Sequence, residues 1–468
     1  MTNARAPLLV LAGTQFPGLE TRYPHADCLL IRDGKLLSFE RWADIKLELP
    51  SNTLVKDLSG TSTLPGLGDA HVHFAATGFL ATALDCKGIK TARELLERIS
   101  SMAKQKAPGE LILGLRLEHL DFPSRRLPTL DELEAAAPRN PVYIRHITGH
   151  ASVASRSALK IINFDPHQAG MELDEHNEPT GSLIAQSTQL ATQRMYAFNA
   201  QQMGYEKAFR AAAKRAAEAG CTVVHALDDL GAVKELLPLE YSLPIRVMPY
   251  TQTFDIEAVE SLGLARIGGC HGCALDGDFD VHTAAISMQY LDKPETSGIL
   301  YHEQDKLENF VLEAHKRGLQ CAFHAVGDRA VEQALSAYES AQGKYPRPNA
   351  RHRIEHAQLI QEDHIERARR AGIVMGLQPA FNYQWEHQIY EQWIGERANS
   401  VDPLASFYHQ GVAIAGGSDS TVTDMKPLLG IHAVVNHSRS EERLSLEQAI
   451  HIFSQGIAYS THHEHRRA

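Results

Sequence analysis

The chain of 468 residues has no long apolar run, no excess of basic residues and few cysteines. No apolar stretch approaches the roughly 18 residues that a membrane-spanning helix needs. The apolar stretch at residues 7–13 is too short for a signal peptide, and no small-residue cleavage pattern follows it. The formal net charge of −11 excludes the basic field that attracts nucleic acid or an anionic membrane. We therefore expect a cytoplasmic protein with no nucleic-acid and no membrane partner.

Six cysteines in so long a chain do not make a disulfide framework. Cys221 and Cys321 lie in apolar runs and are expected to be buried, whereas Cys86 is followed by a lysine and is a candidate for exposure. Cys270 and Cys273 form a single C-x-x-C, which is more typical of two thiols near a turn than of a metal site. Histidine, by contrast, is abundant at 25 residues. That abundance indicates metal or acid–base chemistry.

A repeated unit indicates the fold class. Charged amphipathic helices end in glycine and are followed at once by short apolar strands, with the glycines at Gly220, Gly318, Gly372 and Gly411. Glycine suits the left-handed position that ends a helix, and continuous apolar strands are typical of a parallel sheet. The sequence therefore predicts an α/β protein. We favour a (β/α)8 TIM barrel over a doubly wound sheet, because the polar residues fall at the carboxyl ends of strands.

The chain divides into three predicted parts. Residues 1–63 form a small β module, with strands expected at 8–12, 28–31, 36–39 and 54–58. Residues 64–445 form the barrel, with a long insertion at about 83–205 that lies over its mouth. Residues 446–468 form a C-terminal helix and a solvated, histidine-rich tail.

Histidines and one aspartate mark the candidate site. His71 and His73 are two residues apart at the end of a strand, so their side chains face the same side and can bind one metal ion. His324, His356 and Asp419 each end or follow a later strand. A single histidine of this kind is more often a core residue. The ordered series, with every member at a strand carboxyl end, indicates one metal centre at the mouth of the barrel.

These residue types suit hydrolysis. Neutral imidazoles and a carboxylate bind a divalent metal ion, here expected to be zinc, and leave one position for water. Asp419 can take a proton from that water and pass it to the leaving group. A remaining histidine can polarise the scissile carbonyl. Asp419 and His356 are the catalytic candidates.

Several segments together carry a family resemblance. LPGLGDAHVHF resembles the entry into the barrel of the amidohydrolase superfamily. The branch called amidohydrolase family 3, or YtcJ-like, is similar in segments that follow in order: GHASVASRSAL, AGCTVVHALDD, DGDFDVHTAAI, FHAVGDRAVEQAL, RIEHAQL and GGSDSTV. That branch includes N-substituted formamide deformylases. The resemblance implies a (β/α)8 barrel with a small β-sandwich and hydrolysis of C–N bonds.

The resemblance also implies roles for individual residues. It implies metal ligation by His71, His73, His324 and His356, with Asp419 as ligand and general base. It places His150 near the substrate. One or two metal ions are expected.

The sequence departs from the family pattern at three points. Gly272 stands where the family has a lysine that bridges two metals, and Cys270 is the favoured replacement, with His271 and Cys273 as alternatives. Ala185 replaces a common glutamate on the substrate side. After Tyr459 the given sequence has no segment like the strands that complete the sandwich in the family, so we expect the small β module to be incomplete at its C-terminal side.

Three functions stay open. The leading hypothesis is a metal-dependent hydrolase that cleaves a C–N bond of a small amide, formamide or cyclic amide. The alternatives are a mononuclear zinc deaminase of a heterocycle and a non-catalytic metal-binding relative. Arg329 and Arg353 either bind a substrate carboxylate or pair with the neighbouring Asp328 and Glu355. A small molecule is the expected partner, and a homodimer stays open.

Overall fold

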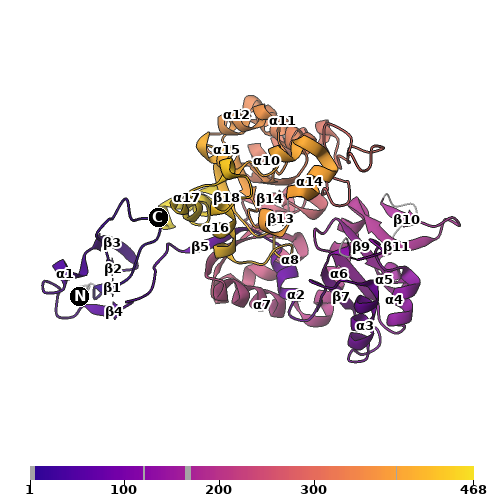
Figure 1. Ribbon diagram of the computed structural model, residues 1–468, viewed down its shortest axis with the longest axis horizontal. Coiled ribbons are helices and arrows are strands. Elements are labelled where there is room, and N and C mark those ends of the chain that lie inside the picture. The colour runs from indigo at the N-terminus through magenta and orange to yellow at the C-terminus, as the bar shows by residue number, and fades with distance from the viewer. Residues whose placement is uncertain (1–5, 120–121, 164–169, 386, 468) are drawn as a thin grey trace.

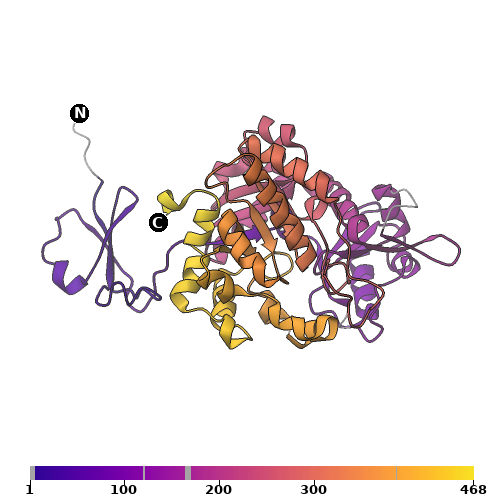
Figure 2. The same ribbon diagram turned by 90° about the horizontal axis from the view of Figure 1, so that it is seen from above.

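The computed structural model describes residues 6–119, 122–163, 170–385 and 387–467. A small N-terminal sheet lies at one end of the long axis, the barrel lies in the middle, and the insertion lies at the other end (Figures 1 and 2). In the described part of the chain, no helix combines the length and the apolar character that crossing a membrane requires.

The central part is an eight-stranded parallel sheet that curves into a barrel. In chain order its strands are β5 (Leu67–Val72), β12 (Cys221–Asp229), β13 (Arg246–Gln252), β14 (Arg266–Gly269), β15 (Gln320–Ala325), β16 (Arg353–His356), β17 (Val374–Leu377) and β18 (Ala413–Gly416). Each strand pairs with the next, and β18 and β5 meet at a seam through an isolated parallel bridge between Val72 and Ser420. The prediction of a TIM barrel is confirmed.

Helices cover the outside of the barrel (Figure 1). They are α2 (Phe74–Phe79), α7 (Tyr205–Glu218), α8 (Leu230–Leu236), α9 (Ile256–Ser261), α10 (Gln304–Lys316), α11 (Asp328–Lys344), α12 (Glu362–Ala371), α15 (Leu404–His409), α16 (Pro427–Val435) and α17 (Leu446–Ile452). The helices α13 (Phe381–Gln384) and α14 (His387–Ile394) lie at the mouth of the barrel, and α18 (Gln455–Ser460) packs at the amino-terminal ends of the strands. The predicted helix stops all adopt positive φ, from 64° at Gly372 to 85° at Gly220. The chain therefore turns from helix into strand where the sequence indicated.

The insertion is an α/β unit with its own sheet rather than a simple covering loop. Its strand order is β10-β11-β9-β8-β7-β6. The strands are β6 (Leu84–Asp85), β7 (Ile112–Leu117), β8 (Val142–His146), β9 (Ala151–Ala154), β10 (Met171–Leu173) and β11 (Pro179–Ile184), and the helices are α3 (Ala92–Ala103), α4 (Leu130–Ala136), α5 (Arg156–Ile162) and α6 (Ala185–Met203). A separate apolar cluster packs between this sheet, α3 and α4. The unit thus has a core of its own, and the loop after β8 reaches the mouth of the barrel.

The N-terminal module contains the four expected strands in a single sheet of order β3-β2-β1-β4. They are β1 (Leu9–Ala12), β2 (Cys28–Arg32), β3 (Lys35–Glu40) and β4 (Leu54–Asp57), with the short helix α1 (Trp42–Ile45). Val10, Ala12 and Cys28 are buried, whereas Leu36 and Leu54 are exposed. The described strands therefore form one layer of the expected sandwich.

Two local predictions are wrong. Cys86 is fully buried, because it follows β6 and packs into the core of the insertion. Burial raises the pKa of its thiol to about 12. The tail is not simply solvated either, since α19 (Glu464–Arg467) is held by an ion pair of 2.7 Å between Glu464 and Arg351. All six cysteines are free, as predicted.

Candidate functional site

Three ligand atoms meet at the barrel seam. His71 lies on β5 and His73 just after it, while Asp419 follows β18. Asp419 Oδ1 lies 3.5 Å from His71 Nε2 and 3.1 Å from His73 Nε2. The backbone N–H of Asp419 donates to the carbonyl oxygen of His71 at 2.8 Å, which fixes the loop across the seam. The three buried side chains therefore form one candidate metal-binding group.

Cys270 and His356 form a second group with His71. Cys270 directly follows β14, and His356 is the last residue of β16. The Sγ atom of Cys270 lies 3.3 Å from His71 Nε2 and 3.8 Å from His356 Nε2. The favoured replacement for the missing lysine thus lies among the histidines, and His71 belongs to both groups.

Hydrogen bonds orient the first two histidines. His71 Nδ1 donates to Glu355 Oε2 at 2.8 Å, and His73 Nδ1 donates to the Leu227 carbonyl oxygen at 3.3 Å. Because both partners accept, each Nδ1 carries a proton, and the neutral form of each ring has its lone pair on Nε2. Both Nε2 atoms face Asp419, so both are available to a metal ion.

A buried ion pair supports His71 from below. Arg353 Nε lies 2.7 Å from Glu355 Oε1, and both side chains are completely buried. Burial raises the pKa of Glu355, but Arg353 and His71 outweigh it and hold that pKa below its ordinary value. The pairing of Arg353 with Glu355 is therefore formed, and it keeps Glu355 ionised as the acceptor for His71.

Most of the candidate ligand imidazoles are neutral. Burial lowers the pKa of His73, brings that of His324 to about 4, and places that of His356 well below its ordinary value. At His71 burial acts in the same direction, but Cys270, Asp419 and Glu355 outweigh it and raise the pKa. Neutral imidazoles, a carboxylate and a thiol are the donor set that zinc prefers, so the residues present fit a divalent metal.

His324 and His150 lie beside these groups. The ring of His324 is 4.4 Å from that of His356 and 4.8 Å from that of His150, between centroids. However, His324 Nε2 donates to the Gly277 carbonyl oxygen at 3.1 Å, and His324 is in neither ligand group. His150 comes from the insertion, and its buried Nδ1 has no hydrogen-bond partner in the described structure. The insertion therefore supplies a side chain to the mouth of the barrel.

Arg329 does not form the expected ion pair. Its Nη1 donates to Ser297 Oγ at 3.3 Å, and Asp328 is instead bound by Arg397 at 2.7 Å. His225 lies in the middle of β12, which continues to Asp229, and its Nδ1 accepts from Arg353 Nη1 at 2.9 Å. His225 is thus part of the barrel interior.

Sequence reasoning missed Arg145 and gave His271 only as an alternative to Cys270. Arg145 Nη2 lies 3.0 Å from His271 Nε2, and the His271 ring stacks on His73 with centroids 4.5 Å apart. Arg145 belongs to β8 of the insertion, so no rule for barrel strands singles it out. His271 adopts φ 45°, a strained value for a residue other than glycine.

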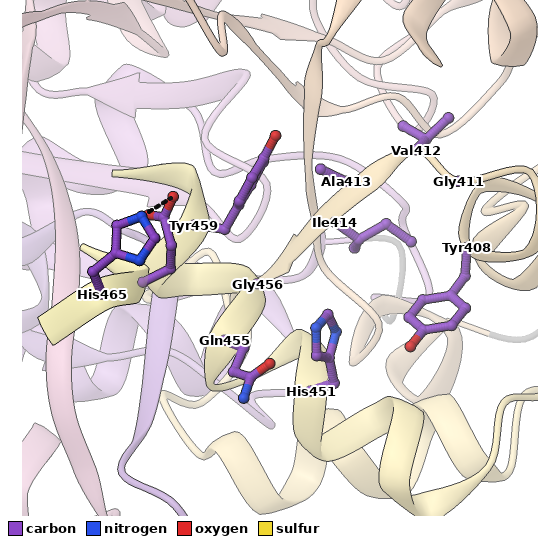
Figure 3. A pocket seen from close by; sticks show the side chains of 11 residues that line it. Tyr408, Gly411, Val412, Ala413, Ile414, His451, Gln455, Gly456, Tyr459 and His465 are labelled. Carbon is purple, nitrogen blue, oxygen red and sulfur yellow. Dashed lines mark ion pairs between the residues drawn. The ribbon is translucent and has the colours of Figure 1, made fainter. Parts of the chain in front are cut away.

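Two cavities lie at opposite ends of the barrel. A cavity of about 270 Å³ is lined by α6, Gln252, His271 and Gly272, next to the histidine groups. A larger cavity of about 580 Å³ lies at the amino-terminal end of β18 (Figure 3). Active sites of these barrels form at the carboxyl ends of the strands, so the smaller cavity is the one at the candidate site.

A parallel (β/α)8 barrel with histidines, a carboxylate and a thiol at its strand carboxyl ends defines the class of barrel hydrolases that use a metal ion. Residues 54–467 match the amidohydrolase family, and the chain belongs to it. The predicted resemblance is confirmed, and metal-dependent hydrolysis with a divalent metal is the activity that the family supports.

The chain is similar to several named proteins. It is 28% identical to the protein LONG AFTER FAR-RED 3 of Arabidopsis thaliana, over 92% of this chain and 78% of that protein. It is 26% identical to YtcJ of Bacillus subtilis (strain 168), whose name describes it as an amidohydrolase, over 92% of this chain and 86% of that one. It is 23% identical to the N-substituted formamide deformylase of Arthrobacter pascens, over 90% of this chain and 81% of that protein.

A solved structure has the same fold. The crystal structure of an uncharacterized metal-dependent hydrolase from Pyrococcus furiosus superposes with a TM-score of 0.75 at 25% identity. The match covers 98% of this chain and 95% of that one, so it includes the N-terminal sheet, the insertion and the barrel.

Proposed function

We propose that the protein hydrolyses a C–N bond of a small amide, formamide or cyclic amide. The observation that carries the proposal is the pair of ligand groups that share His71, at the barrel end where such sites form. The relative named as an N-substituted formamide deformylase supports the choice of bond.

The residues that would hold the metal are His71, His73, His356, Asp419 and Cys270, with His324 beside them. A metal ion bound there supplies Lewis-acid polarisation of a carbonyl and lowers the pKa of a water molecule to about 7. Zinc fits the donor set, and the two groups offer room for one or two ions.

Asp419 moves the proton. Burial raises its pKa, but His71 and His73 outweigh burial and lower the pKa below its ordinary value, so the carboxylate is ionised at neutral pH. Asp419 accepts the proton of the attacking water and returns it to the leaving nitrogen. His150 is held neutral by burial, which lowers its pKa well below the ordinary value, and it donates a hydrogen bond to the substrate carbonyl.

Metal content tests the centre. Wild type, Cys270→Ser and the control Cys273→Ser are purified without chelator and measured by inductively coupled plasma mass spectrometry. We expect two zinc ions per chain in the wild type and one in Cys270→Ser. Cys273 is buried in the main barrel core outside both ligand groups, so its variant keeps the wild-type count. A wild type without metal contradicts the proposal.

A mononuclear deaminase is the second candidate, favoured by Gly272 at the position of the bridging lysine. One zinc ion in both the wild type and Cys270→Ser supports it. The two reactions are then distinguished by their substrates. If the protein releases ammonia from purines or pyrimidines and hydrolyses none of a panel of amides, it is a deaminase.

A further inference from the structure

Arg145 is a buried cation without an anionic partner. Its side chain is 2% exposed, and no carboxylate among the described residues lies within ion-pairing distance of it. Its Nε atom has no hydrogen-bond partner there, its Nη2 lies 3.0 Å from His271 Nε2, and the hydroxyl group of Tyr196 faces its guanidinium group. Burying an unpaired charge costs several kcal/mol, so such a group is typical of a binding site rather than of a core.

His271 cannot satisfy the donors that face it. An imidazole ring offers at most one acceptor nitrogen, whatever its protonation state. Arg145 Nη2 faces its Nε2, and Gln252 Nε2 faces its Nδ1 at 3.2 Å. Gln252 Nε2 also donates to the Leu227 carbonyl oxygen, which fixes the amide orientation. One of the two donors at the ring therefore has no acceptor.

More unpaired donors surround the adjacent cavity of about 270 Å³. Gln189 Nε2 and the hydroxyl group of Tyr196, both on α6, line it. The Gln189 atom is buried without a partner in the described structure, and the Tyr196 hydroxyl faces Arg145. Both side chains are more than nine-tenths buried. A Cβ atom at Gly272 would meet nothing within 4 Å, so this wall of the cavity is open. Asp229 also lines the cavity, and its Oδ1 accepts from the backbone N–H of Ala232 at 3.0 Å, at the start of α8. The cavity thus presents amide and hydroxyl donors, and the guanidinium group of Arg145 contacts its lining residue His271 from outside the lining.

This donor cluster adjoins the candidate metal centre. Arg145 contacts His271, His271 stacks on His73, and His73 Nε2 lies 3.1 Å from Asp419. The cavity therefore borders the candidate metal centre through His271. Planar guanidinium groups bind carboxylates through two parallel hydrogen bonds.

We propose that this cavity is a carboxylate subsite, with Arg145 as the binding residue and Gln189 and Tyr196 as further donors. The substrate is then a small amide that carries a carboxylate within a few bonds of the scissile C–N bond. This inference rests on the proposed amide hydrolysis, because it names the substrate class of the same site.

Matched substrates test the inference. N-formyl and N-acetyl amino acids are compared with their carboxamides on zinc-loaded wild type and Arg145→Gln. We expect the wild type to favour the acids by about 100-fold in kcat/KM, since a site built to bond a polar group strongly rejects analogues that lack it. In Arg145→Gln, kcat/KM should fall for the acids and stay the same for the carboxamides, so that the preference disappears. The zinc content of this variant should not change. Equal losses on acids and carboxamides would overturn the subsite.

A pair of tyrosines separates binding from folding. In the described structure the Tyr196 hydroxyl faces Arg145 but forms no hydrogen bond of good geometry, so Tyr196→Phe should keep the melting temperature and lower kcat/KM on the acids about 10-fold. The Tyr143 hydroxyl lies 2.8 Å from Thr192 Oγ1, so Tyr143→Phe should lower the melting temperature and leave kcat/KM unchanged. If Tyr196→Phe instead behaves like Tyr143→Phe, the assignment of Tyr196 is wrong.

A binding measurement tests the carboxylate subsite even if no amide is hydrolysed and the proposed function fails on this panel. Isothermal titration calorimetry then compares the binding of N-acetyl amino acids with that of their carboxamides. Binding of the acids alone, lost in Arg145→Gln, supports the carboxylate subsite. Equal binding of acids and carboxamides, or equal binding to both proteins, overturns it.

Discussion

Glu355→Gln tests the support beneath the metal centre. The substitution keeps the shape of the side chain but removes the charge that pairs with Arg353 at 2.7 Å and accepts from His71 at 2.8 Å. Both partners of the ion pair are completely buried. Breaking a buried pair from one side leaves an uncompensated charge and costs about 3–5 kcal/mol. We expect a loss of about 3 kcal/mol in the free energy of unfolding, because Arg353 keeps hydrogen bonds to His225 and to the Ala70 carbonyl oxygen.

The same substitution should weaken metal binding. Glu355 orients His71 and fixes its tautomer, and loss of such a partner costs about 10- to 100-fold in metal affinity. Urea unfolding of the metal-free protein gives the stability, and competition with a chromogenic zinc chelator gives the affinity. The double variant Arg353→Met/Glu355→Leu is the control. The double variant should recover most of the free energy of unfolding, because neither charge of the Arg353–Glu355 pair remains buried. It should not recover the zinc affinity, because His71 still lacks its acceptor. Unchanged zinc affinity in Glu355→Gln would refute the assignment of Glu355 to His71.

Two further predictions concern the scaffold. Glu332 accepts from Arg367 at 2.6 and 3.0 Å, and this hydrogen bonding holds its pKa at about 2. Because the folded pKa is depressed, Glu332→Gln should cost about 1 kcal/mol at pH 7, allowing for solvent screening, and the difference should vanish in denaturant titrations between pH 4.5 and pH 2. Gly78→Ala places a Cβ against the backbone of Ala208 and should destabilise by about 2 kcal/mol, whereas Gly343→Ala meets nothing and should stabilise α11 by about 0.5 kcal/mol. Thermal unfolding of both alanine variants checks the pair, and equal shifts would contradict it.

The barrel could be predicted because its signals are local. Each helix stop at a glycine, such as Gly318 or Gly411, is followed by an apolar strand, and a parallel sheet places the strand ends together. That rule alone brings His71, His73 and Asp419 to one point. Cys270 was favoured because strand alternation would point it the same way as Gly272, the position of the missing lysine. The structure instead places Gly272 in a short helical turn at His271–Cys273.

The donor cluster could not be predicted because it depends on how two folding units pack. Arg145 and Tyr196 belong to the insertion, and nothing in their own sequence says that this unit rests against the loop after β14. The surroundings of Cys86 are equally nonlocal, since the lysine beside it suggested exposure and the neighbouring strand buries it. Arg329 directly follows Asp328 in the sequence, which suggested that the two side chains pair. Asp328 instead pairs with Arg397, which lies far away in the chain.

The seam of the barrel is also where the ligands come together. In the described structure, β5 pairs with the segment after β18 through an isolated bridge between Val72 and Ser420, while the neighbouring strand pairs form ladders. His71 and His73 lie on one side of this seam, and Asp419 lies on the other. A metal ion bound by these three residues would link the first barrel strand to the segment after the last one. Metal binding would then also stabilise the closure of the barrel. Removal of the metal by a chelator should therefore first increase amide hydrogen exchange along β5 and in the loop after β18.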